Sequence, residues 1–243
     1  MIDEQDAGHP AGPPAGHLGG RPGGRMGGHA GESPADGSPG GHPADAPQGV
    51  FERAYAGGEA PWDIGRPQPE IVALADAGVF GPRVLDVGCG TGENALFLAT
   101  LGHDVTGVDA APAAIEAAKA KAAERGLDVC FRAADVLGVL PRLIGKFHSV
   151  IDVGFFHALS DEQRALFAER LADKLAPGGV YAMLCFSDRV PGEFGPRRVC
   201  EDEIRATFGG PEFVVREVRP AELHSARRSM PIVDANLALV VRV

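Results

Sequence analysis

The amino-acid sequence predicts an α/β fold with a doubly wound, mostly parallel seven-stranded sheet and an antiparallel hairpin at its C-terminal edge. Three observations support this prediction. Short apolar runs alternate with helix-like segments from about residue 83 onwards, as in parallel sheets with helical crossovers. A glycine-rich turn over residues 88–92 joins the first run to a helix. The last two runs follow each other without a convincing crossover helix, which favours an antiparallel pair.

The first 50 residues differ in composition from the rest of the chain. They hold 14 Gly and 8 Pro but no Phe, Tyr or Trp. A segment with so little apolar side chain cannot offset the entropy lost on ordering, so we expect a disordered Gly/Pro/His-rich tail over residues 1–49. Residues 50–243 remain as one domain. The chain as a whole is 44% hydrophobic and 23% charged, which allows a sizeable core.

Charge, hydropathy and cysteine spacing exclude several classes of protein. The formal net charge is −10, whereas a protein that binds many phosphates normally has a basic surface, so we expect no nucleic-acid partner. No apolar run reaches the roughly 20 residues of a membrane span. The acidic N-terminus lacks the apolar stretch of a secretory signal. The four cysteines show no CxxC or zinc spacing, which favours buried reduced thiols, no metal and a cytoplasmic location.

The segment ahead of the sheet contains two short helices and an irregular stretch. Phe51 and Tyr55, four residues apart, predict a helix that Gly57 and the glycine after it end. Residues 61–69 are rich in proline, which predicts an irregular stretch of chain. A helix is then predicted over residues 70–77, because its apolar side chains share one face.

Seven strands and four further helices follow, mostly in alternation up to the last two strands. We predict strands over residues 83–87, 104–108, 128–132, 148–153, 180–186, 212–218 and 236–241. We predict helices over residues 93–101, 112–125, 161–175 and about 201–208. Pro112 at a helix start and Gly126 after the helix end mark the bounds of the second of these.

The glycine turn lets a ligand approach the backbone without meeting a Cβ atom. Its spacing is G-x-G-x-G, whereas dinucleotide enzymes use G-x-G-x-x-G, and Glu93 occupies the position of their third glycine. A carboxylate in the first helical turn would repel a pyrophosphate. The turn therefore argues against NAD and favours a ligand that carries positive charge.

Two acidic residues follow the next strands. Asp109 lies 21 residues after Gly88, where an acid can accept hydrogen bonds from both hydroxyls of an adenosine ribose. Asp135 follows the third strand, where a carboxylate can accept from an adenine amino group. Either acid alone could be a helix cap or a turn residue. Together with the glycine turn, in this order, they indicate an adenosine-containing ligand.

From about residue 83 to 186 the chain resembles class I S-adenosylmethionine-dependent methyltransferases. The resemblance rests on the glycine turn, the two acids and the Leu-Ala-Pro-Gly-Gly turn over residues 175–179. It implies that S-adenosylmethionine is the cofactor, with Asp86 helping to hold its ammonium group and Asp109 and Asp135 holding the ribose and adenine. The glycines would admit its methionine part. The other implied cofactor contacts are Gly88, Cys89, Gly90, Gly92, Ala110, Val136 and Val153.

A second resemblance narrows the group. The stretch Ala-Pro-Trp-Asp-Ile-Gly-Arg over residues 60–66 resembles the P-W-D-x-G segment of the thiopurine S-methyltransferase and thiol/halide methyltransferase group. In that group the tryptophan packs against the cofactor, which implies this role for Trp62. Residues 151–159 and 192–196 agree with the same group. Bacterial small-molecule O-methyltransferases that act on quinols share the P-W-D-I-G-x-P-Q-P form.

The sequence leaves the methyl acceptor open between a thiol and a phenol or quinol. At pH 7 a thiol with a pKa near 8.5 is about 3% ionised and a phenol with a pKa near 10 about 0.1%. A phenol methylase must recover that difference with a base, for which His157 after the fourth strand is the candidate. We therefore expect a cytoplasmic small-molecule methyltransferase that favours a thiol. O-methylation and a non-catalytic cofactor-binding protein are the alternatives.

Overall fold

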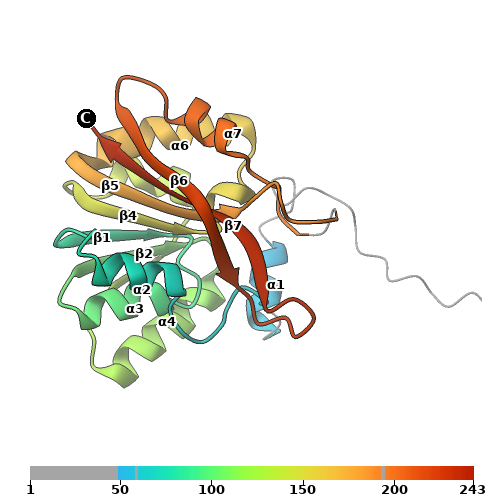
Figure 1. The fold of residues 1–243 in the computed structure, drawn as a ribbon. Helices are drawn as coiled ribbons and strands as arrows, with labels where there is room; N and C mark the ends of the chain where they lie inside the picture. The colour runs from blue at the N-terminus through green and yellow to red at the C-terminus, as the bar shows by residue number, and fades with distance from the viewer. Residues whose placement is uncertain (1–48, 58–59, 193–194) are drawn as a thin grey trace, which may run out of the picture. The chain divides into compact units, whose positions relative to one another are not determined.

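A seven-stranded sheet forms the centre of the structure, a computed structural model that describes residues 49–57, 60–192 and 195–243 (Figure 1). The strand order is β3-β2-β1-β4-β5-β7-β6. The strands are β1 Arg83–Val87, β2 Asp104–Asp109, β3 Cys130–Ala133, β4 Phe147–Val153, β5 Leu175–Phe186, β6 Phe213–His224 and β7 Ile232–Arg242. Strands β1 to β5 are mutually parallel, and β7 runs antiparallel between β5 and β6. The predicted doubly wound sheet with an antiparallel edge hairpin is confirmed.

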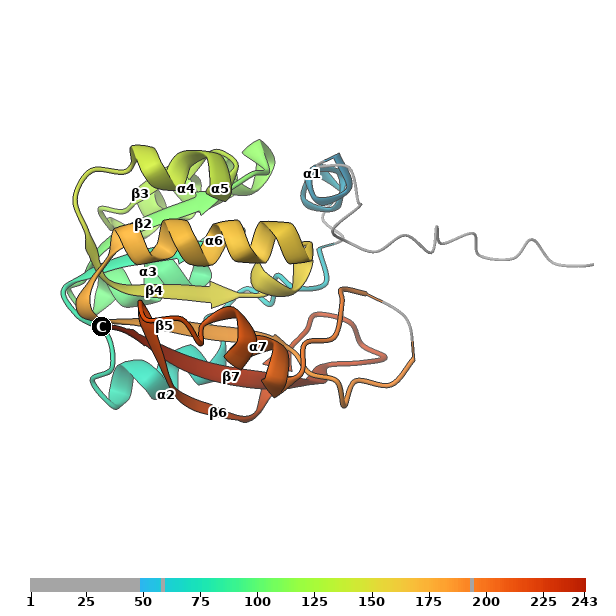
Figure 2. The same ribbon diagram turned by 90° about the horizontal axis from the view of Figure 1, so that it is seen from above.

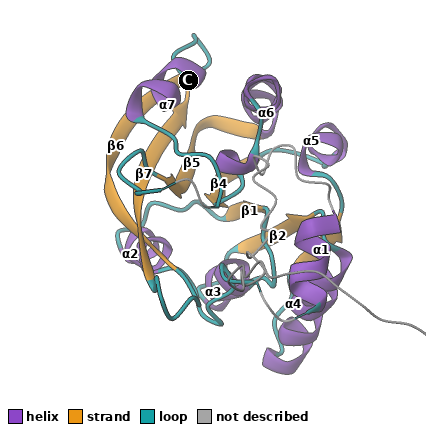
Figure 3. Ribbon diagram, turned by 90° about the vertical axis from the view of Figure 1, so that its right-hand side faces the viewer, coloured by secondary structure: helices purple, strands orange, loops and turns teal. Residues whose placement is uncertain are grey.

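Helices cover both faces of this sheet. They are α1 Gly49–Ala56, α2 Pro69–Asp76, α3 Glu93–Thr100, α4 Pro112–Arg125, α5 Val136–Val139, α6 Asp161–Lys174 and α7 Glu201–Thr207, with short 3-10 turns η2 Leu140–Arg142 and η3 Phe156–Ala158. Helices α2, α3 and α4 lie on one face and α5, α6 and α7 on the other (Figures 2 and 3). This arrangement places the carboxyl ends of the parallel strands at one edge of the sheet, where such folds bind their ligands.

Each face of the sheet has its own apolar core. Ile71 of α2, Leu96 of α3 and Ile115 of α4 are fully buried in one core. Phe167 of α6 and Phe208, the residue that follows α7, are fully buried in the other. Burying each such side chain stabilises the fold by about 1.5–3 kcal/mol, so the two cores hold the strand ends in fixed positions.

The hairpin strands are longer than predicted. Strand β6 extends to His224 although Pro220 lies within it. Proline lacks a backbone N–H, so the sequence pattern favours an earlier end, but β6 pairs only with β7 and is an edge strand that tolerates proline. Helix α5 and η2 are absent from the prediction, because segments this short carry no apolar periodicity.

Helix α1 begins at Gly49, two residues before the predicted start, and packs beside α4. Glu52 Oε2 accepts a hydrogen bond from the Ala113 backbone N–H at 3.3 Å. The tail predicted over residues 1–49 lies outside the described residues apart from Gly49 itself. Through Glu52, the first described element is tied to the start of α4.

The described residues also bear on the expectations about cysteines, metals and membranes. Cys89 and Cys185 are buried free thiols, but Cys130 is exposed and Cys200 half-buried, so the expectation of burial is wrong for Cys130. Strand β3 is at the edge of the sheet, which leaves one of its sides open.

Within the described ranges, no three His, Cys, Asp or Glu side chains are grouped as a metal would need. None of the described helices has the length and hydropathy to cross a membrane.

Candidate active site

The glycine turn lies at the carboxyl end of β1 and leads into α3. Gly88 and Gly90 have φ angles of +66° and +54°, a region that glycine adopts without steric strain. A Cβ atom on Gly90 would lie 2.6 Å from the Tyr55 hydroxyl oxygen, and one on Gly88 would lie 3.0 Å from Phe155 Cβ. Both glycines thus face side chains at the carboxyl end of the sheet, where a ligand would approach the backbone.

Gly92 and Cys89 of the same turn face the interior. A Cβ on Gly92 would lie 2.7 Å from the Phe131 ring, and one on Gly107 would lie 3.0 Å from Cys89 Sγ. Burial raises the pKa of the Cys89 thiol well above its usual value. Gly92 thus allows α3 to pack on Phe131, and the Cys89 side chain packs on β2, so any contact of these two residues with a cofactor would be made by their backbone, and that contact stays a prediction.

Asp86 in β1 is a buried carboxylate with an unused oxygen. Only 1% of its surface is exposed, and Oδ2 has no hydrogen-bond partner among the described residues. Burial, followed by the charges of Asp152 and Asp109, raises its pKa. A buried unpaired carboxylate oxygen is costly, and a ligand ammonium group would satisfy it. The environment of Asp86 therefore fits the amino group of a methionine moiety.

Asp109 joins the end of β2 to the glycine turn. Its Oδ2 accepts from the Gly90 backbone N–H at 2.8 Å and its Oδ1 from the Ala111 N–H at 2.9 Å. Burial raises the pKa of Asp109. Each carboxylate oxygen can accept a second hydrogen bond, so both are able to hold a ribose hydroxyl. The neighbouring Ala110 is exposed.

Asp135 caps helix α5. Its Oδ2 accepts from the Gly138 backbone N–H at 2.8 Å and its Oδ1 from the Leu137 N–H at 3.3 Å. The capping role that the sequence left open is thus present. Asp135 is exposed, whereas the next residue, Val136, is buried. The carboxylate keeps lone pairs that can accept from an adenine amino group.

Trp62 contacts the glycine turn through Tyr55. Trp62 Nε1 donates to the Tyr55 hydroxyl at 2.6 Å, and the two rings meet edge to face at 5.8 Å between centroids. Burial and the charge of Asp109 raise the pKa of Tyr55, which keeps its hydroxyl neutral. Tyr55 is not among the predicted site residues, although its place in a helix just ahead of the P-W-D segment could have indicated it.

Residues 61–68 bridge the glycine turn and the β6–β7 hairpin. Asp63 Oδ2 accepts from Thr91 Oγ1 at 2.7 Å. Gln68 exchanges two hydrogen bonds with the backbone of His224, at 2.9 and 3.0 Å. A cavity of about 330 Å³ lies between this segment and the hairpin, bordered by Asp63, Arg66, His224 and Ile232. The P-W-D segment is therefore anchored at both ends, with space for a small ligand beside it.

Glu93 points to helix α4 and not over the glycine turn. It forms ion pairs with Lys121 at 2.8 Å and Arg125 at 2.9 Å. Two cations therefore compensate the charge that was expected to repel a pyrophosphate. The G-x-G-x-G spacing therefore distinguishes this turn from that of a dinucleotide enzyme, and the charge of Glu93 does not.

His157 lies in η3, directly beyond β4, and only 7% of its surface is exposed. The Phe186 backbone N–H at the end of β5 donates to His157 Nδ1 at 3.0 Å. Burial, followed by the positive charge of Arg164, lowers the pKa of His157 to about 3. A general base works best with a pKa near the working pH. His157 is therefore a weak base at neutral pH, and its catalytic role stays a prediction.

Asp152 holds η3 on the end of β4. Its carboxylate accepts from the Tyr181 hydroxyl at 2.8 Å and from the backbone N–H groups of Phe155 at 2.8 Å and Phe156 at 3.0 Å. Burial raises the pKa of Asp152 to about 7. Asp152 is not among the predicted site residues. Its hydrogen bonds fix the turn that carries Phe155 and His157.

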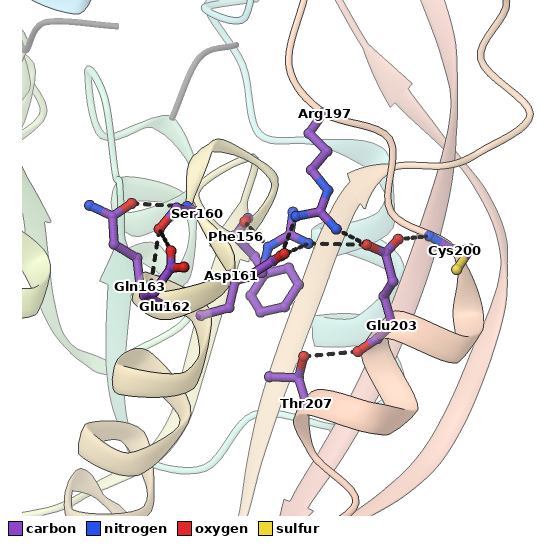
Figure 4. Close-up of polar contacts among 10 residues, drawn as sticks. Phe156, Ser160, Asp161, Glu162, Gln163, Arg197, Cys200, Glu203 and Thr207 are labelled. Atoms are coloured by element: carbon purple, nitrogen blue, oxygen red, sulfur yellow. Dashed lines mark hydrogen bonds and ion pairs between the residues drawn. The ribbon is translucent and has the colours of Figure 1, made fainter. Parts of the chain in front are cut away.

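An ion-pair cluster connects the chain after β5 to the start of α6 (Figure 4). Arg197 pairs with Asp161 and Glu203. The buried Arg164 contacts Glu203 at 3.5 Å, and its guanidinium lies 4.6 Å from the centre of the Phe156 ring. The cluster thus ties α6, α7 and η3 together beside His157.

Comparison with known proteins identifies the family. The family description "Methyltransferase domain" matches residues 84–179. The chain is 38% identical over 188 residues to the 2-heptyl-1-hydroxyquinolin-4(1H)-one methyltransferase of Mycobacteroides abscessus, covering 73% of this chain and 82% of that protein. It is 32% identical over 141 residues to the probable thiol methyltransferase 2 of Arabidopsis thaliana, covering 57% of this chain and 62% of that protein.

A solved structure agrees with these relatives. It is described as "Conversion of a Disulfide Bond into a Thioacetal Group during Echinomycin Biosynthesis", and it is 34% identical with a TM-score of 0.71 over 81% of this chain and 93% of its own. The orphan oxygen of Asp86 and the carboxylate of Asp109 suit the ammonium and ribose groups that such enzymes bind. The chain belongs to the class I S-adenosylmethionine-dependent methyltransferases, and S-adenosylmethionine is its cofactor.

Proposed function

We propose that this small-molecule methyltransferase transfers the methyl group of S-adenosylmethionine to the oxygen of an acidic hydroxyl on a small heteroaromatic ring. The observation that carries the proposal is the 38% identity to a hydroxyquinolinone methyltransferase across 82% of that relative. The aligned 188 residues are about twice as long as the matched segment 84–179. The likeness therefore extends beyond the cofactor half into segments that would wall an acceptor.

Aromatic side chains at the carboxyl end of the sheet support a flat acceptor. The rings of His157 and Phe186 meet edge to face at 5.0 Å between centroids. Phe155 is half-buried beside Gly88, and its ring lies 5.4 Å from that of Phe167. Offset and edge-on contacts of this kind favour a ring as the partner.

Particular residues would hold the cofactor. S-adenosylmethionine supplies an electrophilic methyl group when bound. Asp86 would pair with its ammonium group, Asp109 would accept from its ribose hydroxyls, and Asp135 would accept from its adenine amino group. Trp62 and Tyr55 would cover it at the glycine turn. The remaining contacts would be the backbone of Gly88, Gly90 and Ala110 and the side chains of Val136 and Val153.

Positioning would supply much of the rate. Methyl transfer from a sulfonium is an in-line displacement, so holding the acceptor against the methyl group lowers the barrier. The hydrogen bonds of Asp152 and the Arg164 cluster keep η3 in place, and a fixed wall orients the acceptor. A hydroxyl on an electron-poor ring ionises far more readily than a simple phenol, so the reaction does not require a strong base.

Sulfur is the second candidate acceptor. The probable thiol methyltransferase 2 of Arabidopsis thaliana is 32% identical, and the solved structure at 34% identity is described in terms of a disulfide and a thioacetal. A thiol ionises more readily than a simple phenol, which suits a site without a strong base. The two candidates share one requirement, an anionic nucleophile.

An acceptor panel tests the proposal. The full chain is incubated with isotope-labelled S-adenosylmethionine and an N-hydroxyquinolinone, a phenol, a quinol, an aromatic thiol, an aliphatic thiol and an amine. We expect the highest kcat/KM with the hydroxylated heterocycle, and mass spectrometry should place the methyl group on oxygen. If kcat/KM is at least tenfold higher for a thiol than for the hydroxylated heterocycle, the acceptor atom is sulfur and the proposal of an oxygen acceptor is wrong. Transfer to none of the acceptors would contradict the proposal.

A further inference from the structure

We propose that His157 donates a hydrogen bond to the methyl acceptor instead of removing its proton, and that the enzyme therefore selects acceptors that are already ionised. This inference rests on the proposed function and names the charge state of its substrate. The observation behind it is the hydrogen bond between the Phe186 backbone N–H and His157 Nδ1, at 3.0 Å. A backbone N–H can only donate, so Nδ1 must offer its lone pair.

The donor is held in place by the sheet. Phe186 is the last residue of β5 and pairs with Ala235 of β7, and its carbonyl oxygen accepts from the Val199 N–H at 2.9 Å. The amide therefore cannot turn away from the ring. A neutral histidine has one protonated and one unprotonated nitrogen. With Nδ1 occupied as an acceptor, the proton is on Nε2.

The Nε2–H end of the ring lies at the carboxyl end of β4. A Cβ atom on Gly154 would lie 3.2 Å from His157 Nε2. Gly154 has a φ of +88° and directly follows Val153, the last residue of β4. This end of the sheet is where the acceptor would meet the methyl group. In this geometry His157 offers the site a donor and no lone pair.

The charged groups around His157 oppose its protonation. In Ser-His-Asp triads a carboxylate stabilises the imidazolium that forms when the histidine acts as a base, but none of the described hydrogen bonds joins a carboxylate to His157. On α6, Arg164 adds a positive charge beside η3, and its Nε donates to the Phe156 carbonyl at 3.3 Å. On β4, Asp152 is engaged by Tyr181 and by two backbone N–H groups. On β5, Cys185 is a buried thiol whose pKa is raised by burial.

The reaction then needs no proton acceptor in the chemical step. The acceptor loses its proton to solvent before it binds. The new bond forms from the anionic oxygen or sulfur to the methyl carbon while the carbon–sulfur bond of the sulfonium breaks, and its electron pair stays on sulfur as a neutral thioether. One negative and one positive charge disappear together. A donor at Nε2 favours binding and orientation of the anion, which affects KM more than kcat.

Two substitutions separate the two roles of His157. His157→Gln keeps an N–H donor but has no titratable nitrogen, and His157→Phe keeps a ring but has no donor. We expect H157F to lose about tenfold to hundredfold in kcat/KM, mostly through KM, since a hydrogen bond to an anion is lost. We expect H157Q to retain at least five times the kcat/KM of H157F. Equal losses above a hundredfold, mostly in kcat, would indicate a base and overturn the inference.

The matched control is His148→Gln. His148 lies near the amino end of β4, the strand that precedes η3, and is exposed, so its substitution should leave all kinetic constants unchanged. A second test measures how kcat/KM of the wild-type enzyme depends on pH for a series of phenols of graded acidity. The pH at which kcat/KM falls on the acidic side should follow the pKa of each phenol. A fall at the same pH for every phenol would belong to an enzyme base and contradict the inference.

Two measurements do not depend on turnover or on the folding of a variant. Nitrogen-15 NMR of histidine-labelled wild-type protein should show His157 with its proton on Nε2 from pH 6 to 8, and a proton on Nδ1 would overturn the inference. Electron-poor phenols bound to the complex with S-adenosylhomocysteine should absorb as phenolates, with a lower pKa than in solution, and a raised pKa would contradict the inference. If phenolates bind but no acceptor is methylated, the inference stands and the proposed function fails.

Discussion

Asp63 accepts a hydrogen bond from the Thr91 hydroxyl at 2.7 Å, which fastens the P-W-D segment to the glycine turn. The same carboxylate accepts from the Gly65 backbone N–H at 3.1 Å and lies 3.9 Å from Lys121 Nζ. The aspartate of the P-W-D motif therefore contacts other residues of the protein and stabilises the position of the segment. It holds the segment with Trp62 beside the glycine turn.

Asp63→Asn should weaken cofactor binding by about tenfold. The substitution weakens a hydrogen bond to a charged group, for which about 1.5 kcal/mol is a typical contribution, and 25% of the Asp63 side chain is exposed. Calorimetric titration with S-adenosylhomocysteine measures the change. Asp76→Asn, at an exposed position in α2, should bind like wild type. An unchanged affinity for D63N would show that the segment does not depend on this contact.

Gly90 and Tyr55 should show energetic coupling. Gly90→Ala places a methyl group 2.6 Å from the Tyr55 hydroxyl oxygen, whereas the next ring atom is 3.5 Å away. In a Tyr55→Phe background the same substitution should cost less by about 0.5–3 kcal/mol, the range found for residues in contact. The left-handed backbone at Gly90 adds a similar penalty in both backgrounds, so it cancels. Urea unfolding of the four proteins measures the coupling, and strictly additive effects would contradict the contact.

Asp152 should make the protein less stable as the pH rises from about 4 to 7. Burial raises its folded-state pKa from 3.8 to about 7, so over this range the folded state binds more protons than the unfolded state. Stability then falls with rising pH. Below about pH 4 the carboxyl is protonated in both states, and its contribution is constant.

Asp152→Asn removes this titration. The free energy of unfolding of D152N relative to wild type should therefore increase between pH 5 and pH 8, as measured by urea unfolding. His157, whose pKa is lowered, contributes with the opposite sign, but it is present in both proteins and cancels in the difference. A difference that does not change with pH would mean that the folded-state pKa of Asp152 is not raised.

Much of the fold follows from the sequence because its signals are local. The alternation of apolar runs with helices predicts the parallel strands. Pro112 and Gly126 predict a helix over residues 112–125, and the observed α4 has the same bounds. The C-terminal hairpin follows from the missing crossover. The extent of β6 does not, because the tolerance for Pro220 depends on its edge position, which is a property of the whole sheet.

The positions of candidate site residues can be predicted where they follow from the local strand and turn pattern. Asp86 and Asp109 lie in or at the end of buried strands next to a glycine turn, and the structure places both as expected. Gly92 has the same residue type and a similar φ to its neighbours, yet it faces Phe131, a contact that only the packing of β3 and α4 decides. His157 depends on Phe186, 29 residues further along the chain, which no local pattern indicates. Tyr55 lies only seven residues before its partner Trp62, so its position ahead of the P-W-D segment could have indicated it.

Calorimetry of the full chain with S-adenosylhomocysteine tests the central claim most directly, because it asks whether the residues grouped at the end of the sheet form a cofactor site. We predict one site per chain and a dissociation constant that Asp109→Asn raises at least tenfold, since Asp109 loses its charge where it would accept from the ribose. The melting temperature of D109N provides the check on folding. No binding to wild type, or equal affinity for folded D109N, would contradict the account.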